Sequence, residues 1–226
     1  MGGYMSEHPE LIVMLTYNDQ TVLNATDIFE ECRNSKASIW GFKELPLPFG
    51  EMKKLYNYMK QCGKTTSLEV VAYTEEEGLA GAETAAACGC DILMGTVFSD
   101  RINRFCLEHG LKYMPFVGKV WGRPSVLEGD IDEMIAEAKS YISRGAYGID
   151  LLGYRYTGDA VELNRRMSAE VDAPVCIAGS VNSFNRLDEI KEAGPWSFTI
   201  GSAFFDNKFS GTFAEQIDKV CDYMAR

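Results

Sequence analysis

The amino-acid sequence predicts a single (β/α)8 barrel, the TIM-barrel form of the α/β class, in which eight parallel strands alternate with helices. Apolar runs of strand length alternate with segments of helical periodicity at intervals of roughly 25 residues. Eight such units fit into the 226 residues, a length that suits one barrel domain. Because repeated βα units make parallel strands, eight of them can close on themselves and leave no sheet edge. A doubly wound open sheet is the alternative fold.

The eight expected strands are apolar runs that end in turn residues or polar side chains. They are Leu11 to Tyr17, Ser38 to Phe42, Ser67 to Tyr73, Asp91 to Val97, Lys112 to Val117, Tyr147 to Leu152, Pro174 to Ala178 and Ser197 to Ile200. Residues 1–10 are expected to form a short leader. No Pro-, Ser- or Gly-rich tract divides the rest, so we expect one domain over residues 1–226.

Helices are expected between these strands, because a capping residue opens most of the intervening segments and a glycine follows many of them. The expected capping or first-turn residues are Asn24 or Thr26, Pro48, Thr74, Ser99 and Asp130. The glycines expected just after helices, where a left-handed residue often ends a helix, are Gly63, Gly89, Gly110, Gly145 and Gly194. From residue 131 to residue 144, apolar side chains recur at every third or fourth position, which predicts a helix with one face on the sheet.

Composition and charge exclude several classes of function. The formal net charge is -11 and the sequence pI is about 4.7, with no run of Lys and Arg, so we expect no nucleic-acid or membrane partner. No apolar run reaches the roughly 18 residues of a membrane helix. Seven cysteines, an odd and mostly scattered set, argue against a disulfide framework and favour reduced thiols in the cytoplasm. The oligomeric state is left open, with a homo-oligomer as one option.

Two strands near the end of the chain stop on the same dipeptide, a glycine followed by a serine. The seventh strand ends before Gly179-Ser180 and the eighth before Gly201-Ser202. In a (β/α)8 barrel the carboxyl ends of the strands converge on the mouth that carries the active site. A glycine lets a ligand approach the backbone closely, and amide N–H groups and serine hydroxyls can donate hydrogen bonds to an anion. We therefore expect the phosphate group of a small phosphorylated metabolite at these two stops.

This part of the sequence resembles the phosphate-binding segment of the ribulose-phosphate-binding barrels. It consists of Gly179-Ser180, a helix from Phe184 to Ala193, Gly194, and then Ile200-Gly201-Ser202-Ala203. The group includes phosphoribosylanthranilate isomerase, the histidine-pathway barrels, N-acylmannosamine-phosphate epimerase and the small keto-acid phosphate aldolases. The resemblance implies a barrel fold with a phosphate held by the two Gly-Ser pairs, although Ser180 stands where many members have a second glycine. As a motif it covers the last quarter of the chain.

The catalytic residues of the individual families are not matched. The aldolases place a Schiff-base lysine on the sixth strand, where this chain has Asp150. The metal-dependent pentulose-phosphate epimerases use histidines at strand ends, whereas His8 lies in the leader and His109 beside a helix-ending glycine. We therefore expect no metal and no cofactor, with acid-base work left to carboxylates and lysines.

Four residues near strand ends are the expected catalytic groups, namely Lys43, Glu44, Lys119 and Asp150. Asp150 interrupts an apolar run, where burial would raise the pKa of a carboxyl group. Its alternative role is to orient Arg155 or Lys119. Lys43 and Glu44 follow an aromatic strand at the mouth, where either could bind substrate or transfer a proton. An ordinary ion pair is the alternative for both.

Two more charged residues on strands or at their ends are expected to contact substrate. Glu69 interrupts the third strand beside Lys43 on the neighbouring strand, so the two would pair, either structurally or to set the charge of the lysine. Arg155 lies between two tyrosines. It would hold a phosphate or carboxylate through two hydrogen bonds, or else stack on a tyrosine at the surface.

The longest segment without a helix or strand pattern runs from Gly118 to Gly129, after the fifth strand. We expect an irregular loop or lid, with Lys119 and Arg123 flanking Trp121 in a mixture suited to a polar ligand. Arg123 is accordingly an expected substrate-binding residue, and an exposed flexible loop is the alternative. The positions expected at the barrel mouth also include Asn18, Asp19 and Thr96.

These residues together predict a metal-independent isomerase, epimerase or lyase that acts on a small phosphorylated sugar or keto compound. Asp150 or Glu44 would take a proton beside a carbonyl group, while Lys43 or Lys119 stabilises the enediolate. A Schiff base on either lysine is the lyase variant. The alternative is a phosphate-ester sensor without turnover, similar to the glycerol-phosphate-responsive antiterminators, although the acidic surface disfavours contact with RNA.

Overall fold

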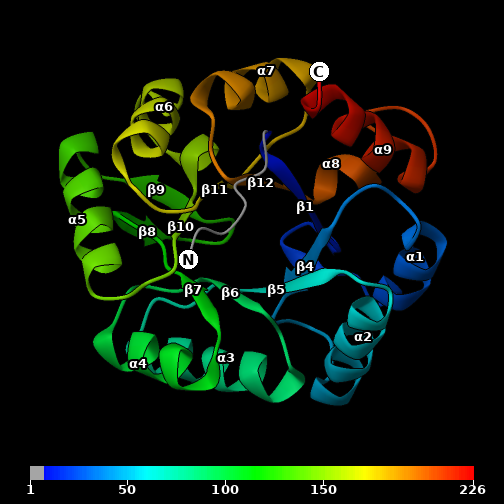
Figure 1. The fold of residues 1–226 in the computed structure, drawn as a ribbon, viewed down its shortest axis with the longest axis horizontal. Helices are drawn as coiled ribbons and strands as arrows, with labels where there is room; N and C mark the ends of the chain where they lie inside the picture. The colour runs from blue at the N-terminus through cyan, green and yellow to red at the C-terminus, as the bar shows by residue number, and fades with distance from the viewer. Residues whose placement is uncertain (1–7) are drawn as a thin grey trace.

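The computed structural model describes residues 8–226 and has the predicted (β/α)8 architecture (Figure 1). Eight parallel strands form one sheet in the order β10-β11-β12-β1-β4-β5-β6-β7. Their bounds are β1 Glu10–Met14, β4 Ile39–Lys43, β5 Thr65–Val70, β6 Ile92–Gly95, β7 Lys112–Met114, β10 Ile149–Leu151, β11 Val175–Ile177 and β12 Ser197–Ile200. Each overlaps one of the expected apolar runs. Of the expected leader, residues 1–7 lie outside the described part of the chain.

Hydrogen bonds between the chain around β10 and the chain around β7, the first and last strands of this order, close the barrel. The N–H of Tyr147 donates to the carbonyl of Tyr113 at 2.9 Å, and the N–H of Asp150 donates to the carbonyl of Pro115 at 3.0 Å. β10 therefore lies against β7 as well as β11. This closure excludes the doubly wound open sheet, which would leave two unpaired edges.

A ring of helices surrounds the barrel (Figure 1). It consists of α1 Ala25–Cys32, α2 Phe49–Gln61, α3 Glu75–Cys88, α4 Asp100–His109, α5 Ile131–Ser143, α6 Ala160–Glu170, α7 Phe184–Ala193 and α9 Phe213–Met224. Thr74, Ser99 and Asp130 cap their helices through side-chain hydrogen bonds, as predicted, whereas Asn24 precedes α1 without one. Two short helical turns, Gly153–Arg155 and α8 Ser202–Phe205, follow β10 and β12.

Two antiparallel hairpins stand on the carboxyl side of the barrel. β2 Thr16–Tyr17 pairs with β3 Gln20–Thr21, so the predicted first strand is interrupted after Met14. β8 Lys119–Trp121 pairs with β9 Val126–Glu128. The predicted irregular loop between Gly118 and Gly129 is thus an ordered hairpin. Val120 and Leu127 are buried, and the residues on either side of them are exposed or half-buried.

Side chains along the strands alternate between the barrel interior and the layer under the helices. On β1, Leu11 and Val13 join the large core between sheet and helices, while Ile12 and Met14 face inward. The inward cluster consists of Ile12, Met14, Ile39, Ile92, Met94, Met114 and Cys176. It fills the barrel below the mouth, so that polar inward-facing residues gather at the carboxyl end.

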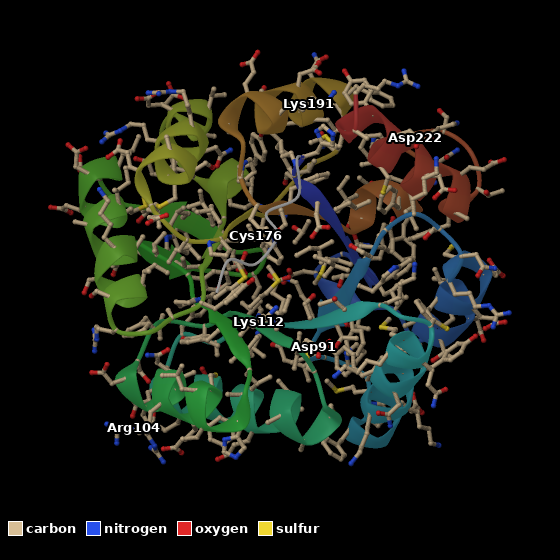
Figure 2. All side chains as sticks on the ribbon, in the orientation of Figure 1. Asp91, Arg104, Lys112, Cys176, Lys191 and Asp222 are labelled. Carbon is tan, nitrogen blue, oxygen red and sulfur yellow. The ribbon has the colours of Figure 1, made fainter. Side chains whose placement is uncertain are left out.

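The charged surface lies on the helices, and the thiols lie mostly in the core. Figure 2 shows Cys176 near the barrel axis and Arg104, Lys191 and Asp222 on the outer ring. All seven cysteines lie in the described part of the chain and are free. Burial raises the pKa of Cys90 to about 12, so this thiol stays protonated at neutral pH. Within residues 8–226, no helix combines the length and the apolarity needed to cross a bilayer.

Candidate active site

A cavity of about 210 Å³ opens where the carboxyl ends of the strands meet. Its walls come from the ends of β1, β4, β5, β11 and β12, from the turn after β10, and from Ser125 in the β8–β9 hairpin. The charged residues that line it are Asp19, Lys43, Glu69, Arg155, Asp206 and Lys208. The mouth of a (β/α)8 barrel is where catalytic groups gather, because its loops converge there.

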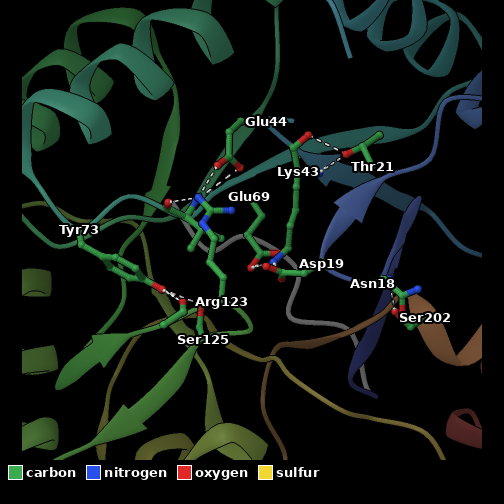
Figure 3. Close-up of polar contacts among 12 residues, drawn as sticks. Asn18, Asp19, Thr21, Lys43, Glu44, Glu69, Tyr73, Arg123, Ser125 and Ser202 are labelled. Atoms are coloured by element: carbon green, nitrogen blue, oxygen red, sulfur yellow. Dashed lines mark hydrogen bonds and ion pairs between the residues drawn. The ribbon is translucent and has the colours of Figure 1, made fainter. Parts of the chain in front are cut away.

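Both Gly-Ser stops line this cavity, as the sequence predicts. Gly179 and Ser180 have φ angles of 86° and 56°, which turn the chain sharply after β11. A β-carbon on Gly201 would come within 2.8 Å of the carbonyl oxygen of Thr16, so this glycine also admits the backbone after β1. The Ser202 hydroxyl accepts a hydrogen bond from the N–H of Asn18 at 3.2 Å (Figure 3). Its own O–H remains able to donate into the cavity.

Two cations face this part of the cavity. Arg155 ends the turn after β10 and lies over Gly179, and Lys208 follows α8. Among residues 8–226, neither side chain has a hydrogen-bond or ion-pair partner. Asp206 also lines the cavity, two residues before Lys208. Unpaired cations next to turned backbone and serine hydroxyls make this end of the cavity suited to an anion.

The opposite wall is built around Lys43, the last residue of β4. Its ammonium forms an ion pair with Asp19 and lies 3.4 Å from Glu69 Oε1 on β5 (Figure 3). Asp19 reaches it because Asn18 and Asp19, with φ angles of 49° and 66°, form the two-residue turn of the β2–β3 hairpin. The Thr21 hydroxyl fixes that hairpin by accepting from the N–H of Lys43 at 2.9 Å and donating to its carbonyl at 2.7 Å.

The two carboxylates keep Lys43 charged. Burial alone would lower the pKa of this ammonium, but the charges of Glu69 and Asp19 outweigh it and raise the pKa above the ordinary lysine value. A charged lysine donates hydrogen bonds and stabilises negative charge, whereas nucleophilic attack requires the neutral amine. The arrangement therefore suits Lys43 to stabilise an oxyanion.

Asp150 lies inside the barrel, below the cavity, and does not line it. Its side chain is fully buried, and within the described part of the chain neither carboxyl oxygen has a hydrogen-bond partner of ordinary geometry. Burial, followed by the negative charge of Glu69, raises the pKa of Asp150 well above the usual carboxyl value, against smaller opposing effects of Lys43 and the Gly95 backbone. These surroundings favour the neutral acid, and substrate in the cavity would reach Asp150 only through its neighbours.

The remaining predicted residues lie on the rim, and the cavity wall does not include them. Arg123 Nη2 donates to the carbonyl of Val71 at 2.8 Å and to Glu44 Oε1 at 3.3 Å (Figure 3). Lys119 forms an ion pair with Glu128 at 3.3 Å across the β8–β9 hairpin, and its side chain is 75% exposed. These contacts hold the hairpin beside the mouth, and the structure does not bring Glu44, Arg123 or Lys119 together with Lys43.

The hairpin is also fastened through Tyr73. The Tyr73 hydroxyl donates to the carbonyl of Gly122 at 2.8 Å and lies 2.9 Å from the hydroxyl of Ser125 (Figure 3). Ser125 is buried and lines the cavity. Trp121 is about half exposed on the hairpin and takes no part in the cavity wall.

Sequence reasoning missed Lys208 and Asp206, and it placed Asp19 at the mouth without a role. Lys208 and Asp206 come after the four-residue helix α8, so only the turn of that helix brings them back over the end of β12. The signal that could have found them is their position within seven residues of Gly201. Within residues 8–226, no group of three or more His, Cys, Asp or Glu side chains is placed to hold a metal ion.

Comparison with solved structures identifies the fold. A structure described as native KDPGal superposes with a TM-score of 0.70 at 13% identity, covering 97% of this chain and 96% of that one. Tryptophan synthase from M. tuberculosis gives 0.68 at 14% identity over 96% of this chain and 93% of that one. Orotidine 5'-phosphate decarboxylase from Pyrococcus horikoshii gives 0.65 at 12% identity over 96% and 99%.

Sequence comparison adds nothing to this likeness, since no family model and no curated protein matches the chain. At identities of 12 to 14%, the structural likeness establishes the fold. The barrel architecture implied by the resemblance to the phosphate-binding barrels is confirmed. The chain is a (β/α)8 barrel with the fold of orotidine 5'-phosphate decarboxylase and tryptophan synthase.

Proposed function

We propose that the protein is a metal-independent isomerase, epimerase or lyase that acts on a small phosphorylated sugar or keto compound. One observation carries the proposal. The two Gly-Ser stops line the same cavity as the cluster of Lys43, Asp19 and Glu69. Arg155 and Lys208, which have no hydrogen-bond or ion-pair partner among residues 8–226, line it as well. An anion-binding end and an acid-base end in one small cavity are what such chemistry requires.

The phosphate is anchored at Gly179, Ser180, Gly201 and Ser202, with Arg155 and Lys208 supplying positive charge. Binding energy from this remote group holds the reacting carbons against the opposite wall. The anchor lies at the ends of β11 and β12, and Lys43 stands at the end of β4, with β1 between. Adjacent strands are about 4.8 Å apart, so the two ends of the cavity are separated by roughly 10 to 15 Å along the sheet.

The chemical step uses two groups of the cavity wall, Glu69 as the base and Lys43 as the stabilising cation. Glu69 takes the proton from the carbon beside the substrate carbonyl, and the electron pair of that C–H bond moves onto the carbonyl oxygen. The Lys43 ammonium stabilises the enediolate that forms. Return of the proton from Glu69 to the adjacent carbon, with the hydroxyl proton of the enediolate moving from one oxygen to the other, gives the isomer. Protonation of the original carbon on its opposite face by water, while Glu69 releases its proton to solvent, gives the epimer. Glu69 takes the base role here because Asp150 and Glu44 do not line the cavity.

In the lyase variant Glu69 takes the proton of a hydroxyl group two carbons from the carbonyl, and the carbon that carries this hydroxyl leaves as a new carbonyl group. The electron pair of the broken C–C bond moves into the enediolate, which is then protonated. A Schiff base on Lys43 would require a neutral amine, which the raised pKa of this lysine disfavours. Borohydride treatment during turnover separates the two routes. We expect no covalent adduct, and a reduced adduct on Lys43 would establish the Schiff-base route.

The comparisons support a catalytic barrel, since their names describe a decarboxylase with a phosphorylated substrate and a synthase. The partner is a small phosphorylated metabolite, and the net charge of -11 opposes the binding of nucleic acid and anionic membranes.

Seven free cysteines fit a reducing cytoplasm. Self-association of the barrel into a homo-oligomer is part of the proposal, and light scattering of the purified protein measures it.

The direct test is thermal unfolding with a panel of sugar phosphates, each beside its dephosphorylated counterpart. A ligand at 100 times its Kd adds about 2.7 kcal/mol to the free energy of unfolding. We expect phosphate esters to raise Tm and their dephosphorylated counterparts to leave it unchanged, and bound esters to be converted on incubation. Binding without conversion would instead identify a sensor, and equal shifts within each pair would overturn the phosphate site.

A further inference from the structure

The two ends of the cavity differ in charge. Two cations and one carboxylate, namely Arg155, Lys208 and Asp206, lie at the end formed by β10 and β12. One cation and two carboxylates, namely Lys43, Asp19 and Glu69, lie at the end formed by β4, β5 and the β2–β3 hairpin. These six are the charged residues of the cavity wall. The first end therefore has a net positive charge, and the second has a net negative charge around its single ammonium group.

The negative excess at the Lys43 end is sheltered from water. Lys43 and Glu69 are each 9% exposed, and the Asp19 side chain is 22% exposed. Charges in such surroundings act over several ångströms with little screening. Lys43 is already paired with both carboxylates, so a ligand carboxylate beside the ammonium would lie against the negative charges of Asp19 and Glu69.

Asp150 below the cavity does not change this balance. It contributes another carboxyl group and no cation, and it lies near enough to Glu69 for their charges to interact. Whether it is protonated or ionised, the Lys43 end has no excess of positive charge. A second anionic group on the ligand would therefore meet two or more carboxyl groups around one paired ammonium.

Resting on the phosphate-ester function proposed above, we infer that the cavity selects phosphate monoesters with an uncharged hydroxyl or carbonyl at the far end and rejects those with a carboxylate there, and that Asp19 and Glu69 set this selection. Sugar phosphates and polyol phosphates belong to the selected class. Phosphorylated sugar acids and keto acids belong to the rejected class. The carbonyl or hydroxyl oxygen accepts a hydrogen bond from Lys43 without displacing either carboxylate.

Two four-carbon esters test the inference, because they differ only at the far end. Erythritol 4-phosphate ends in a CH2OH group and 4-phosphoerythronate in a carboxylate. Calorimetric titration of the wild-type protein with each, and with inorganic phosphate, gives three Kd values. We expect inorganic phosphate and erythritol 4-phosphate to bind, and 4-phosphoerythronate to bind at least tenfold more weakly than erythritol 4-phosphate.

Variants then assign the selection to residues. Glu69→Gln and Asp19→Asn each remove one negative charge, and each should reduce the ratio of the two Kd values to threefold or less. Glu128→Gln removes the same charge from the β8–β9 hairpin, outside the cavity wall, and should leave the ratio at its wild-type value. Circular dichroism of each variant checks folding, and the wild-type comparison stands without any variant.

The outcomes separate this inference from the proposed function. If inorganic phosphate binds and 4-phosphoerythronate binds as tightly as erythritol 4-phosphate, the charge selection is wrong and the phosphate site stands. If none of the three ligands binds, the phosphate site is wrong and the selection falls with it. If the wild type discriminates and both folded variants discriminate equally well, the assignment to Asp19 and Glu69 is overturned.

Discussion

The side chain of Arg155 lies directly over Gly179, so that a β-carbon at position 179 would come within 2.6 Å of Arg155 Cγ. The absence of a side chain at Gly179 thus lets the guanidinium reach the cavity wall. The sequence predicts that the missing side chain lets a ligand approach the backbone at this glycine. In the structure the same glycine also makes room for the cation that would hold the ligand.

Gly179→Ala should therefore raise the Kd for phosphate strongly while lowering the free energy of unfolding only moderately. The φ of 86° is unfavourable for alanine by about 1–2 kcal/mol, and the new methyl group displaces Arg155. We expect the Kd for inorganic phosphate to rise at least tenfold. Gly63→Ala is the matched control, because Gly63 has a φ of 75° with no heavy atom within 4 Å of the added methyl. It should lose similar stability and keep the wild-type Kd. If Gly179→Ala also keeps the wild-type Kd, Arg155 does not take part in anion binding.

Lys43→Met should abolish catalysis while leaving the phosphate end intact. Loss of a group that stabilises an oxyanion typically lowers kcat by about a hundredfold or more. The variant also leaves Asp19 and Glu69 without their cation, and breaking such a buried pair costs about 3 kcal/mol. Inorganic phosphate should still bind, with its Kd changed by less than about threefold.

Lys119→Met is the control for this change, since Lys119 lies on the β8–β9 hairpin with a largely exposed side chain. Its ion pair with Glu128 is of the exposed kind that contributes less than about 1 kcal/mol. Turnover and stability should both match the wild type. A loss of turnover in Lys119→Met, with Lys43→Met active, would reverse the roles assigned to the two lysines.

Asp150→Asn should make the protein more stable than the wild type as the pH rises. Burial and the charge of Glu69 raise the pKa of Asp150 in the folded state. Above the ordinary carboxyl pKa of about 3.9, the unfolded chain releases this proton while the folded chain retains it, so wild-type stability falls with pH until the folded pKa is reached. The amide cannot ionise and escapes this loss.

Urea unfolding at a series of pH values from about 4 to 8 measures the difference between the two proteins. The advantage of Asp150→Asn should grow by up to about 1.4 kcal/mol per pH unit within this window. Asp172→Asn removes a carboxylate from an exposed loop and serves as the control for the change in net charge. Parallel curves for wild type and Asp150→Asn would show that Asp150 is ionised in the folded protein.

Tyr73→Phe should loosen the β8–β9 hairpin without unfolding the barrel. The change removes the hydrogen bonds of the Tyr73 hydroxyl to Gly122 and Ser125, worth about 1 kcal/mol each. Amide hydrogen exchange should become faster in residues 119–128 and remain unchanged in the strands. Tyr147→Phe removes a hydroxyl at the other end of the barrel and should not affect the hairpin. Unchanged exchange in Tyr73→Phe would mean that the buried Val120 and Leu127 and the contacts of Arg123 hold the hairpin without the tyrosine hydroxyl.

The fold could be predicted from the sequence because its signals are local. Each signal depends on residues that are close together in the chain. These signals are the apolar runs of the strands, the helix caps at Thr74, Ser99 and Asp130, and the glycines after helices. The β8–β9 hairpin was not predicted, because each of its strands is only three residues long. Its loop contains Gly122 and Pro124, which are typical of an irregular loop.

The cavity was predicted in part, for the same physical reason. Gly179 and Gly201 end adjacent strands, so the order of the units brought them together. The pairing of Lys43 with Asp19 depends instead on a tight turn that folds back over the end of β4. Likewise, the placement of Asp150 below the cavity depends on how deep its position lies along the barrel axis, which the spacing of residues in β10 does not reveal.

A crystal structure of the protein with erythritol 4-phosphate tests the location of the phosphate site most directly. The phosphorus atom should lie between the Gly179-Ser180 and Gly201-Ser202 turns, with its oxygens within hydrogen-bond distance of Arg155 and with the far hydroxyl toward Lys43. Density for the phosphate at the opposite end, against Lys43 and Glu69, or outside the cavity altogether, would contradict the assignment on which the proposed chemistry depends.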